Sequence, residues 1–467
     1  MGKHLSLLLL GVAAIMSGCT LAPTYVRPAV PVSAVWPTGA AYPQNPAASD
    51  PAGTQSLRWQ DLITDTKLQQ VMELALTNNR DLRLAALNVQ RAQAMYGIQR
   101  AELLPTVDAT GSGSRQRVPA DLSSSGQRAT VQQYGVNLGV LSWELDFFGR
   151  IRSLKDRALE EYLATAQAQR GAEILLVSSV ANAYLTVAAT RESLQLAEST
   201  LAAQRGSYDL VKRRYDADIV PELDLLRAQT QVDTARGEVA RFTQLAALSV
   251  NALHLLVGAP VPNELQPTAL ASVTPPRELG AGLSSEVLLR RPDVLQSEDL
   301  LLAANADIGA ARAAFFPRIT LTAAVGTASS ELSGLFGAGS DTWSYAPKIV
   351  LPIFDARTWS AHRAAKVQRE MAVTQYERAI QVAFREVADA LAQRGTVGDQ
   401  VAAQESLVEA TAAAYRLADT RYAKGIDSYL TVLDAQRSLQ GAQQGLISLR
   451  LARLANLLTL YKVLGGG

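Results

Sequence analysis

Apolar and polar positions along this chain follow two different periods. Over 65–102, apolar side chains recur every three or four residues, which predicts an amphipathic helix. After Pro105 the period changes to two, and the alternating runs predict strands at about 106–116 and 131–146. Runs of about ten alternating residues also have the length that crosses a bilayer as a tilted barrel strand.

The segments that follow are helical and unusually long. No proline occurs between Gly149 and Pro221, and a helix over about 150–217 would extend for about 100 Å at 1.5 Å per residue. An ordinary globular domain has no need of such a helix. A shorter helix is predicted at about 222–256, and a connection rich in proline and glycine follows at 258–283.

The same order of elements then repeats. The second set comprises a helix at about 284–314, strands at about 318–328 and 342–354, and helices at about 357–424 and 428–462. Identities 207 positions apart support a duplication, for example Arg214-Tyr215 with Arg421-Tyr422. The pattern therefore predicts repeat 1 at 65–257, repeat 2 at 284–462 and a tail at 463–467. A helical solenoid would repeat every 34–47 residues or so and has no place for such strands.

Four amphipathic strands cannot close a membrane barrel, and lipid does not tolerate an open sheet edge. Closure requires about eight strands or more, so several chains must contribute. The strand faces fit this arrangement: Thr, Ser and Asn would line a watery lumen, while Tyr134, Trp343 and Tyr345 would form a lipid-facing aromatic girdle. The sequence thus predicts an α+β membrane protein, in which an oligomeric β-barrel is continued by a tube of long helices.

Charge and composition exclude other classes of function. The 44 basic and 43 acidic residues balance, which argues against nucleic acid binding because that usually requires a basic face. The abundant Ala and Leu and the few aromatic residues suit long helices that pack closely together. No later segment has about twenty uninterrupted apolar residues, so no transmembrane helix is predicted.

The first residues are typical of a lipoprotein signal peptide at 1–18. An apolar run at 5–15 precedes the sequence MSGC, which resembles a lipobox, and the thiol of Cys19 would receive a diacylglycerol and an N-acyl lipid. Met16 stands where leucine is usual, and an ordinary secretory signal is the alternative. Thr20 replaces the aspartate of the inner-membrane retention signal, which favours the outer membrane. We expect a lipidated, extended N-terminal arm at 19–64, and no other cofactor.

Several motifs, in order along nearly the whole mature chain, resemble those of the TolC-like outer-membrane factor family and its OprM-type lipoproteins of RND multidrug efflux systems. They are CTLAPTYVRP, WQDLITDTKLQQ, WELDFFGRIR, RRPDVLQSEDLLLAANADIGAARAAFFPRITLTA and RYAKGIDSYLTVLDAQRSL. The resemblance implies a homotrimer with a twelve-stranded β-barrel in outer-membrane lipid, a periplasmic α-helical barrel, and an equatorial belt that includes 258–283. It also implies two partners, a periplasmic adaptor protein and an inner-membrane RND transporter.

The same resemblance assigns candidate sites to the chain. By motif match, the periplasmic gate comprises Tyr422, Leu430, Asp434 and Arg437. The residues alone favour an ordinary exposed ion pair between Asp434 and Arg437, and the resemblance reverses that preference. The turns expected to contact the adaptor contain Arg214, Tyr215, Asp218, Arg421, Gly425 and Ser428. The first turn departs from the second, with Asp218 opposite Gly425 and Pro221 opposite Ser428, so it is expected to dock differently.

No catalytic or metal-binding motif occurs in the sequence, and we predict that the chain is not an enzyme. Of the three histidines, His4 lies in the signal, while His254 and His362 are isolated on helices and are expected to be packed or solvated. The favoured function is a passive outer-membrane efflux duct for drugs or other small molecules. A type I protein-secretion duct and a non-channel lipoprotein scaffold are the alternatives, although a scaffold would lack the amphipathic strands.

Overall fold

The computed structural model describes residues 20–42, 58–277 and 285–466. The chain divides into two compact units. The described part of the first comprises 20–29, 88–166 and 296–376, and that of the second comprises 30–42, 58–87, 167–277, 285–295 and 377–466. Each unit takes segments from both sequence repeats, because the long helices continue from one unit into the other.

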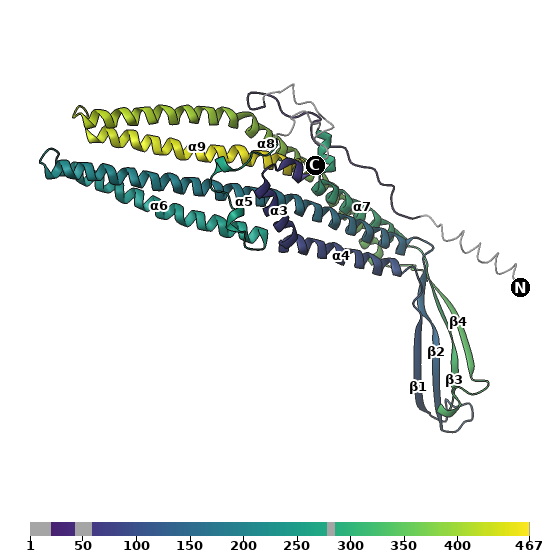
Figure 1. Ribbon diagram of the computed structural model, residues 1–467. Helices are drawn as coiled ribbons and strands as arrows, with labels where there is room; N and C mark the ends of the chain where they lie inside the picture. Colours follow the sequence, from purple (N-terminus) through teal and green to yellow (C-terminus); the bar gives the residue numbers. More distant parts are fainter. Residues whose placement is uncertain (1–19, 43–57, 278–284, 467) are drawn as a thin grey trace. The chain divides into compact units, whose positions relative to one another are not determined.

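The first unit contains one antiparallel sheet of four strands, β1 (Asp108–Val118), β2 (Ala129–Leu145), β3 (Arg318–Ser329) and β4 (Asp341–Val350). The strands lie in sequence order and each pairs with the next, so β1 and β4 are the two edges (Figure 1). The prediction of four strands per chain is confirmed. The last strand ends at Val350, whereas the alternation extended it to 354.

The register places the apolar side chains of the sheet on one face. Residues directly opposite each other on paired strands share a face, and the pairs include Val325 with Trp343 and Ala323 with Tyr345. Trp343 is 80% exposed, and β4 is exposed along its whole length. In a single chain this sheet therefore presents uncovered apolar residues and two unpaired edges.

The first predicted helix, 65–102, is in fact two helices, α3 (Thr66–Asn78) and α4 (Arg80–Ala101). Asn79 separates them because its side chain bonds in two directions. Its Oδ1 accepts from Leu82 N at 2.8 Å and caps α4, while its Nδ2 donates to Leu256 O at 2.8 Å. Before α3, Asp65 acts as N-cap and accepts from Leu68 N at 2.9 Å. A short helix, α2 (Trp59–Leu62), precedes it.

The long helices lie close to their predicted limits, at α5 (Arg150–Asp216) and α8 (Ala356–Ala423). Each is followed by a shorter helix, α6 (Glu222–Val257) or α9 (Tyr429–Val463), while α7 (Pro292–Ala313) precedes the second strand pair. Among the described helices, α5 has a window apolar enough to cross a membrane, with a mean hydropathy of 1.5, but 56% of that window is buried inside the chain. Interior packing accounts for its composition.

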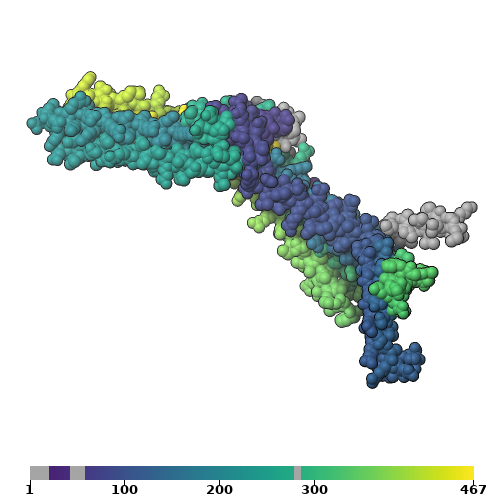
Figure 2. All heavy atoms as spheres, turned by 60° about the horizontal axis from the view of Figure 1, so that its bottom comes forward, coloured from purple at the N-terminus to yellow at the C-terminus, as the bar shows by residue number. Residues whose placement is uncertain are grey.

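In the second unit, α5 with α6 and α8 with α9 form two hairpins that lie side by side with their turns at the same end (Figure 1). The space-filling view shows the side chains of α5 and α6 meeting along the hairpin (Figure 2). The connection predicted at 258–283 contains the short 3₁₀ helices η2 (Asn263–Leu265) and η3 (Leu270–Ser272), and a third, η4 (Ser285–Arg290), lies just before α7.

The extended arm docks on α7 in the first unit. Three side chains spaced seven residues apart on α7 form a stripe that holds it. Arg312 Nη1 donates to Leu21 O at 3.0 Å, and Asn305 Nδ2 donates to Pro23 O at 2.7 Å. The third, buried Glu298, accepts from Tyr25 Oη at 3.0 Å and from Arg27 Nε at 2.7 Å. These three residues lie in the motif RRPDVLQSEDLLLAANADIGAARAAFFPRITLTA, and this segment thus has a structural role in docking the arm.

The start of the same segment is fixed in the second unit. Arg291 is buried and pairs with Asp293 at 2.7 Å and with Glu386 of α8 at 2.8 Å. Its Nη1 also donates to Val463 O at 2.7 Å, which joins it to the end of α9. A buried guanidinium is tolerated only when its donors are satisfied, so this arginine ties three helices together.

Candidate functional site

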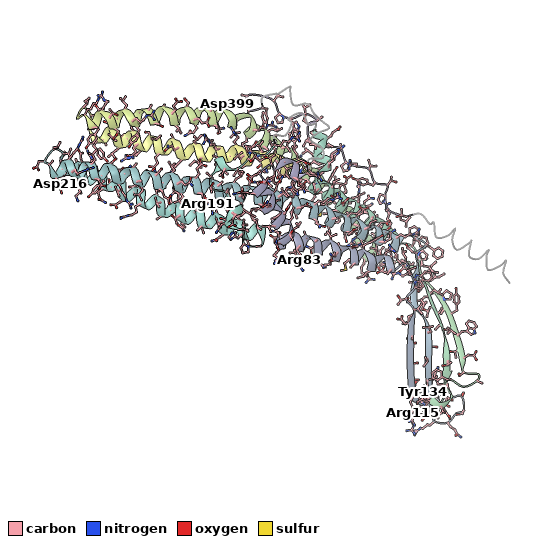
Figure 3. The ribbon with its side chains drawn as sticks, in the orientation of Figure 1. Arg83, Arg115, Tyr134, Arg191, Asp216 and Asp399 are labelled. Atoms are coloured by element: carbon pink, nitrogen blue, oxygen red, sulfur yellow. The ribbon has the colours of Figure 1, made fainter. Side chains whose placement is uncertain are left out.

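The two helical hairpins of the second unit end in the same kind of turn, beginning with the first. At the end of α5, Ile219 N donates to Arg214 O and Asp218 N donates to Tyr215 O, both at 2.9 Å. This pair of bonds is a Schellman motif, which satisfies the last carbonyls of a helix. Figure 3 labels Asp216 at this tip.

The second turn reproduces these bonds at the end of α8. Ile426 N donates to Arg421 O and Gly425 N donates to Tyr422 O, again at 2.9 Å. Both turns need one residue in the left-handed region, where Gly425 has φ 72° and Asp218 has φ 56°. Aspartate adopts this conformation at a cost that glycine avoids.

The residues that begin the returning helices also match. Pro221 is the N-cap of α6 with φ −73° and ψ 155°, and Ser428 is the N-cap of α9 with φ −74° and ψ 154°. Proline adopts this φ without strain. The departures at Asp218 and Pro221 therefore leave the backbone of the first turn equivalent to that of the second, and different docking of the two turns stays a prediction.

Tyr422 lies in a buried cluster between the hairpins. It packs with Tyr429 at 5.2 Å between ring centroids, and the cluster includes Val211 and Ala228 of the other hairpin. Burial and the neighbouring Tyr422 raise the pKa of Tyr429 to about 12. Within the described residues, the Tyr422 hydroxyl is buried without a hydrogen-bond partner.

Arg214 connects the two tips. Its guanidinium carbon lies 5.0 Å from the centroid of the Tyr422 ring, and its Nη2 donates to Ala423 O at 3.1 Å. A cation over an aromatic face is attracted by the ring quadrupole. Arg214 thus uses both its charge and a hydrogen bond to hold the end of α8.

The other predicted gate residues lie on an exposed stripe of α9, away from Tyr422. Arg437 Nη1 is 3.9 Å from Asp434 Oδ1, and both side chains are more than 60% exposed. Leu430, one turn nearer the tip, is also exposed. In the single chain, Asp434 and Arg437 form an ordinary i,i+3 surface pair, which contributes at most about 1 kcal/mol.

Arg421 forms a much closer pair with Asp427 inside the second turn. Its Nε donates to Asp427 Oδ2 at 2.6 Å and its Nη2 donates to Oδ1 at 3.0 Å. This two-point contact lowers the pKa of Asp427 below its usual range. Neither Asp427 nor Tyr429 belongs to the motif-derived candidate sites. A position-by-position comparison of the two repeats contains the signal, because Val220 stands opposite Asp427 and Glu222 opposite Tyr429.

Among the described residues, no group of three His, Cys, Asp or Glu side chains could hold a metal ion. His362 lies with its ring centroid 5.8 Å from that of Phe315, and burial together with Lys366 and Arg312 lowers its pKa. This is the environment of a packed histidine. Cys19, the predicted lipidation site, lies outside the described residues.

Comparisons with known proteins agree with this architecture. The model of the outer membrane efflux protein family matches residues 71–259 and 283–466. The toluene efflux pump outer membrane protein TtgC of Pseudomonas putida is 48% identical, over 99% of this chain and 96% of its own. OprJ of Pseudomonas aeruginosa is 41% identical, over 98% and 94%. The open-state structure of the MtrE outer membrane channel of Neisseria gonorrhoeae is 37% identical, with a TM-score of 0.84 over 96% of this chain and 98% of that one.

Two matches of the family model fall on the two sequence repeats, and relatives and structural neighbours cover almost the whole chain. The fold is therefore that of the trimeric TolC-type outer-membrane channels, and the efflux function expected from the motifs is confirmed. The chain belongs to the outer membrane efflux protein family, the channel components of efflux pumps.

Proposed function

We propose that three copies of this chain form one duct through which small molecules leave the cell passively. The observation that carries the proposal is the sheet with two unpaired edges and an exposed apolar face. Lipid cannot hydrogen-bond an open edge, so β4 of one copy must pair with β1 of the next until the ring closes. Four strands per chain and three chains give a closed barrel wide enough for a lumen.

We infer that the tips of the hairpins form a gated junction with a periplasmic adaptor protein. We infer that Arg214, Tyr215, Asp218, Arg421, Gly425 and Ser428 form the adaptor-contacting surface, and that Tyr422, Leu430, Asp434 and Arg437 belong to the gate. Around a threefold axis the exposed stripe on α9 would bring like charges of Asp434 together. The transporter that loads the duct would be an inner-membrane RND pump, and a lipid on Cys19 would anchor the arm.

The name of one relative suggests the class of compound. TtgC is named for toluene efflux, so apolar or amphipathic small molecules are the cargo we propose here. The described tips expose apolar side chains, among them Ile219, Leu223 and Ile426. A wide, water-filled duct has little reason to select among small molecules, so we infer that the pump selects the cargo.

Native mass spectrometry and planar-bilayer recording of the detergent-solubilised protein test the proposal. We expect a trimer that conducts, with a low conductance that reflects closed tips. The arrangement would be refuted by a protein that is folded and stable as a monomer, or by a trimer that stays without conductance even after its tips are loosened.

A further inference from the structure

The sheet has one apolar and one polar face, and the strand register shows which residues belong to each. Residues directly opposite each other share a face, so Leu138, Val325 and Trp343 lie together, and each is more than half exposed. On the other face Gly135 lies against Ser112, where a Cβ would meet Ser112 Oγ at 3.3 Å. In the proposed barrel the apolar face meets lipid and the polar face lines the lumen.

Tyr134 marks the outer edge of the apolar face. The outer end of the sheet is the end away from α5 and α7, where β1 turns into β2 and β3 stops. There the Tyr134 ring covers Gly113 of β1, and its hydroxyl donates to Gln132 Oε1 at 3.4 Å, farther out along β2. A tyrosine at a membrane surface keeps its ring in lipid and its hydroxyl near water. Tyr134 therefore indicates the level at which the hydrocarbon ends.

Two arginines continue this face beyond Tyr134. Arg115 pairs with Gln132 and Arg117 pairs with Thr130, so both lie on the same face as Tyr134. Figure 3 labels Arg115 and Tyr134 at the outer end of the hairpin formed by β1 and β2. For a strand tilted by about 40°, the two arginines lie roughly 5 and 10 Å beyond Tyr134. Headgroups extend about 5–8 Å past the hydrocarbon, so Arg115 lies within their layer and Arg117 near its surface.

The positive charge at this level is not neutralised by the chain itself. Arg115 and Arg117 are exposed, and within the described residues neither guanidinium has a carboxylate partner. Arg128, just before β2, is exposed as well. Between Arg115 and Arg128 the sequence contains three arginines and one acidic residue, Asp121. The outer end of the hairpin therefore offers an anion a net positive, accessible surface next to an apolar one.

We propose that Arg115 and Arg117 bind the phosphate groups of lipopolysaccharide, the phosphorylated glycolipid of the outer leaflet. The outer end of the sheet faces the exterior, because the long helices at its other end occupy the periplasm. A guanidinium matches phosphate oxygens with two-point contacts, and the acyl chains of the same lipid cover the apolar face below. This inference rests on the membrane barrel proposed above.

Titration of the detergent-solubilised trimer with diphosphoryl lipid A, followed by native mass spectrometry, tests the site. We expect up to three bound lipids per trimer, one for each copy. Arg115→Gln and Arg117→Gln should each weaken binding about fivefold, and the double variant about 25-fold, the effect of removing basic residues from an anionic lipid surface. Lys348→Gln is the matched control, because Lys348 pairs with Thr320 on the polar face and its loss changes the charge equally.

Two other lipids identify the group that is recognised. Monophosphoryl lipid A is expected to bind the unchanged protein more weakly than the diphosphoryl form, and phosphatidylglycerol, with one phosphate and no sugar, more weakly still. Equal binding of all three lipids would overturn the site, and so would a double variant that binds diphosphoryl lipid A as the unchanged protein does.

An ion pair between copies is the competing role for these arginines. In the closed ring β1 pairs with β4 of the next copy, and Asp341 begins β4 on the same face. If Arg117 serves that pair, Arg117→Gln and Asp341→Asn will lower the thermal stability of the trimer equally and leave lipid binding unchanged, which overturns the proposal. Conductance judges the duct separately. A conducting trimer that binds no lipid A refutes the lipid site alone, whereas a protein that forms no conducting trimer refutes the duct.

Discussion

Asp218 and Gly425 occupy the same left-handed position in the two tip turns, with φ of 56° and 72°. The backbone bonds around them are the same, so the difference between the two residues lies in conformational cost. An L-residue with a Cβ is disfavoured there by about 1–2 kcal/mol, and aspartate by somewhat less because its short side chain tolerates the region. The first turn therefore carries strain that the second does not.

Asp218→Gly is expected to stabilise the first tip by up to about 1 kcal/mol, since glycine removes the clash of the Cβ. Gly425→Ala is expected to destabilise the second tip by a similar amount. Hydrogen exchange of the amides at 214–224 and 421–431 measures both effects locally. Equal exchange rates in the unchanged protein and the Asp218→Gly variant would show that the turn carries no strain.

Asp299 on α7 is a second residue in an unfavourable environment, because its surroundings disfavour the charged carboxylate. Burial and the neighbouring Glu298 raise its pKa from 3.8 to about 6, and its Oδ2 is buried without a hydrogen-bond partner within the described residues. Glu160 of α5 is its other acidic neighbour, and its pKa is also raised, by burial and by Asp299. A raised pKa in the folded chain means that the protonated form of Asp299 is the one that favours folding.

The stability linked to Asp299 is fully present below about pH 4 and is lost as the pH rises through about 6. Asp299→Asn is therefore expected to raise the free energy of unfolding at pH 7.5, by on the order of 1 kcal/mol after allowance for solvent screening. Thermal unfolding of the solubilised protein between pH 4 and 8 measures this. The exposed Asp399 provides the control Asp399→Asn, and an Asp299→Asn curve parallel to that of the unchanged protein would contradict the prediction.

Helix α9 combines a packed face with an exposed stripe. Val432 and Leu433 are buried against the cluster between the hairpins, whereas Leu430, Asp434 and Arg437 face outward. The packed face fixes the helix, and the exposed stripe is free to meet other copies. A change on the stripe should therefore alter the closure of the tips without unfolding the hairpin.

The double variant Asp434→Ala with Arg437→Ala is expected to open the channel while leaving its thermal unfolding nearly unchanged. Exposed pairs contribute at most about 1 kcal/mol each, so the few links involved make a closure that adaptor binding could overcome. Single-channel conductance checks the prediction, with sensitivity of cells to antibiotics as support. If the double variant stays tightly closed at the original conductance, Asp434 and Arg437 form only an ordinary surface ion pair.

In the whole chain, the arm joins the predicted lipidation site to the unit that contains the sheet. Thr20 Oγ1 lies 3.4 Å from Ser153 Oγ, close to the start of α5 and just past the end of β2. The stripe on α7 holds the rest of the arm, from Leu21 to Arg27. The residue next to Cys19 thus lies close to the junction of β2 and α5.

Cys19→Ser is expected to abolish acylation and to slow delivery to the outer membrane, while the docked arm and the barrel still allow a trimer to form. Mass spectrometry of the mature N-terminus and membrane fractionation measure the two effects. A mature N-terminus that carries no lipid in the unchanged protein, or that begins elsewhere, would rule out the lipoprotein assignment.

The elements and their order follow from local patterns in the sequence. Periods of two and of three to four residues identify the strands and the long helices, because side-chain burial in each depends only on position along the element. The duplication shows which turns are equivalent, and the number of strands requires several chains. The residues of the candidate gate came from motif similarity, since an i,i+3 charge pair such as Asp434 and Arg437 has no distinctive local pattern.

Contacts between distant segments depend on how the helices pack in the folded chain. The break at Asn79 depends on a carbonyl of α6, the path of the arm depends on three side chains of α7, and the position of Arg214 depends on Tyr422 and Ala423. Each of these residues suits several local environments equally well. Which partner it meets is set by the packing of helices some hundreds of residues apart in the chain, and a one-dimensional pattern contains no such information.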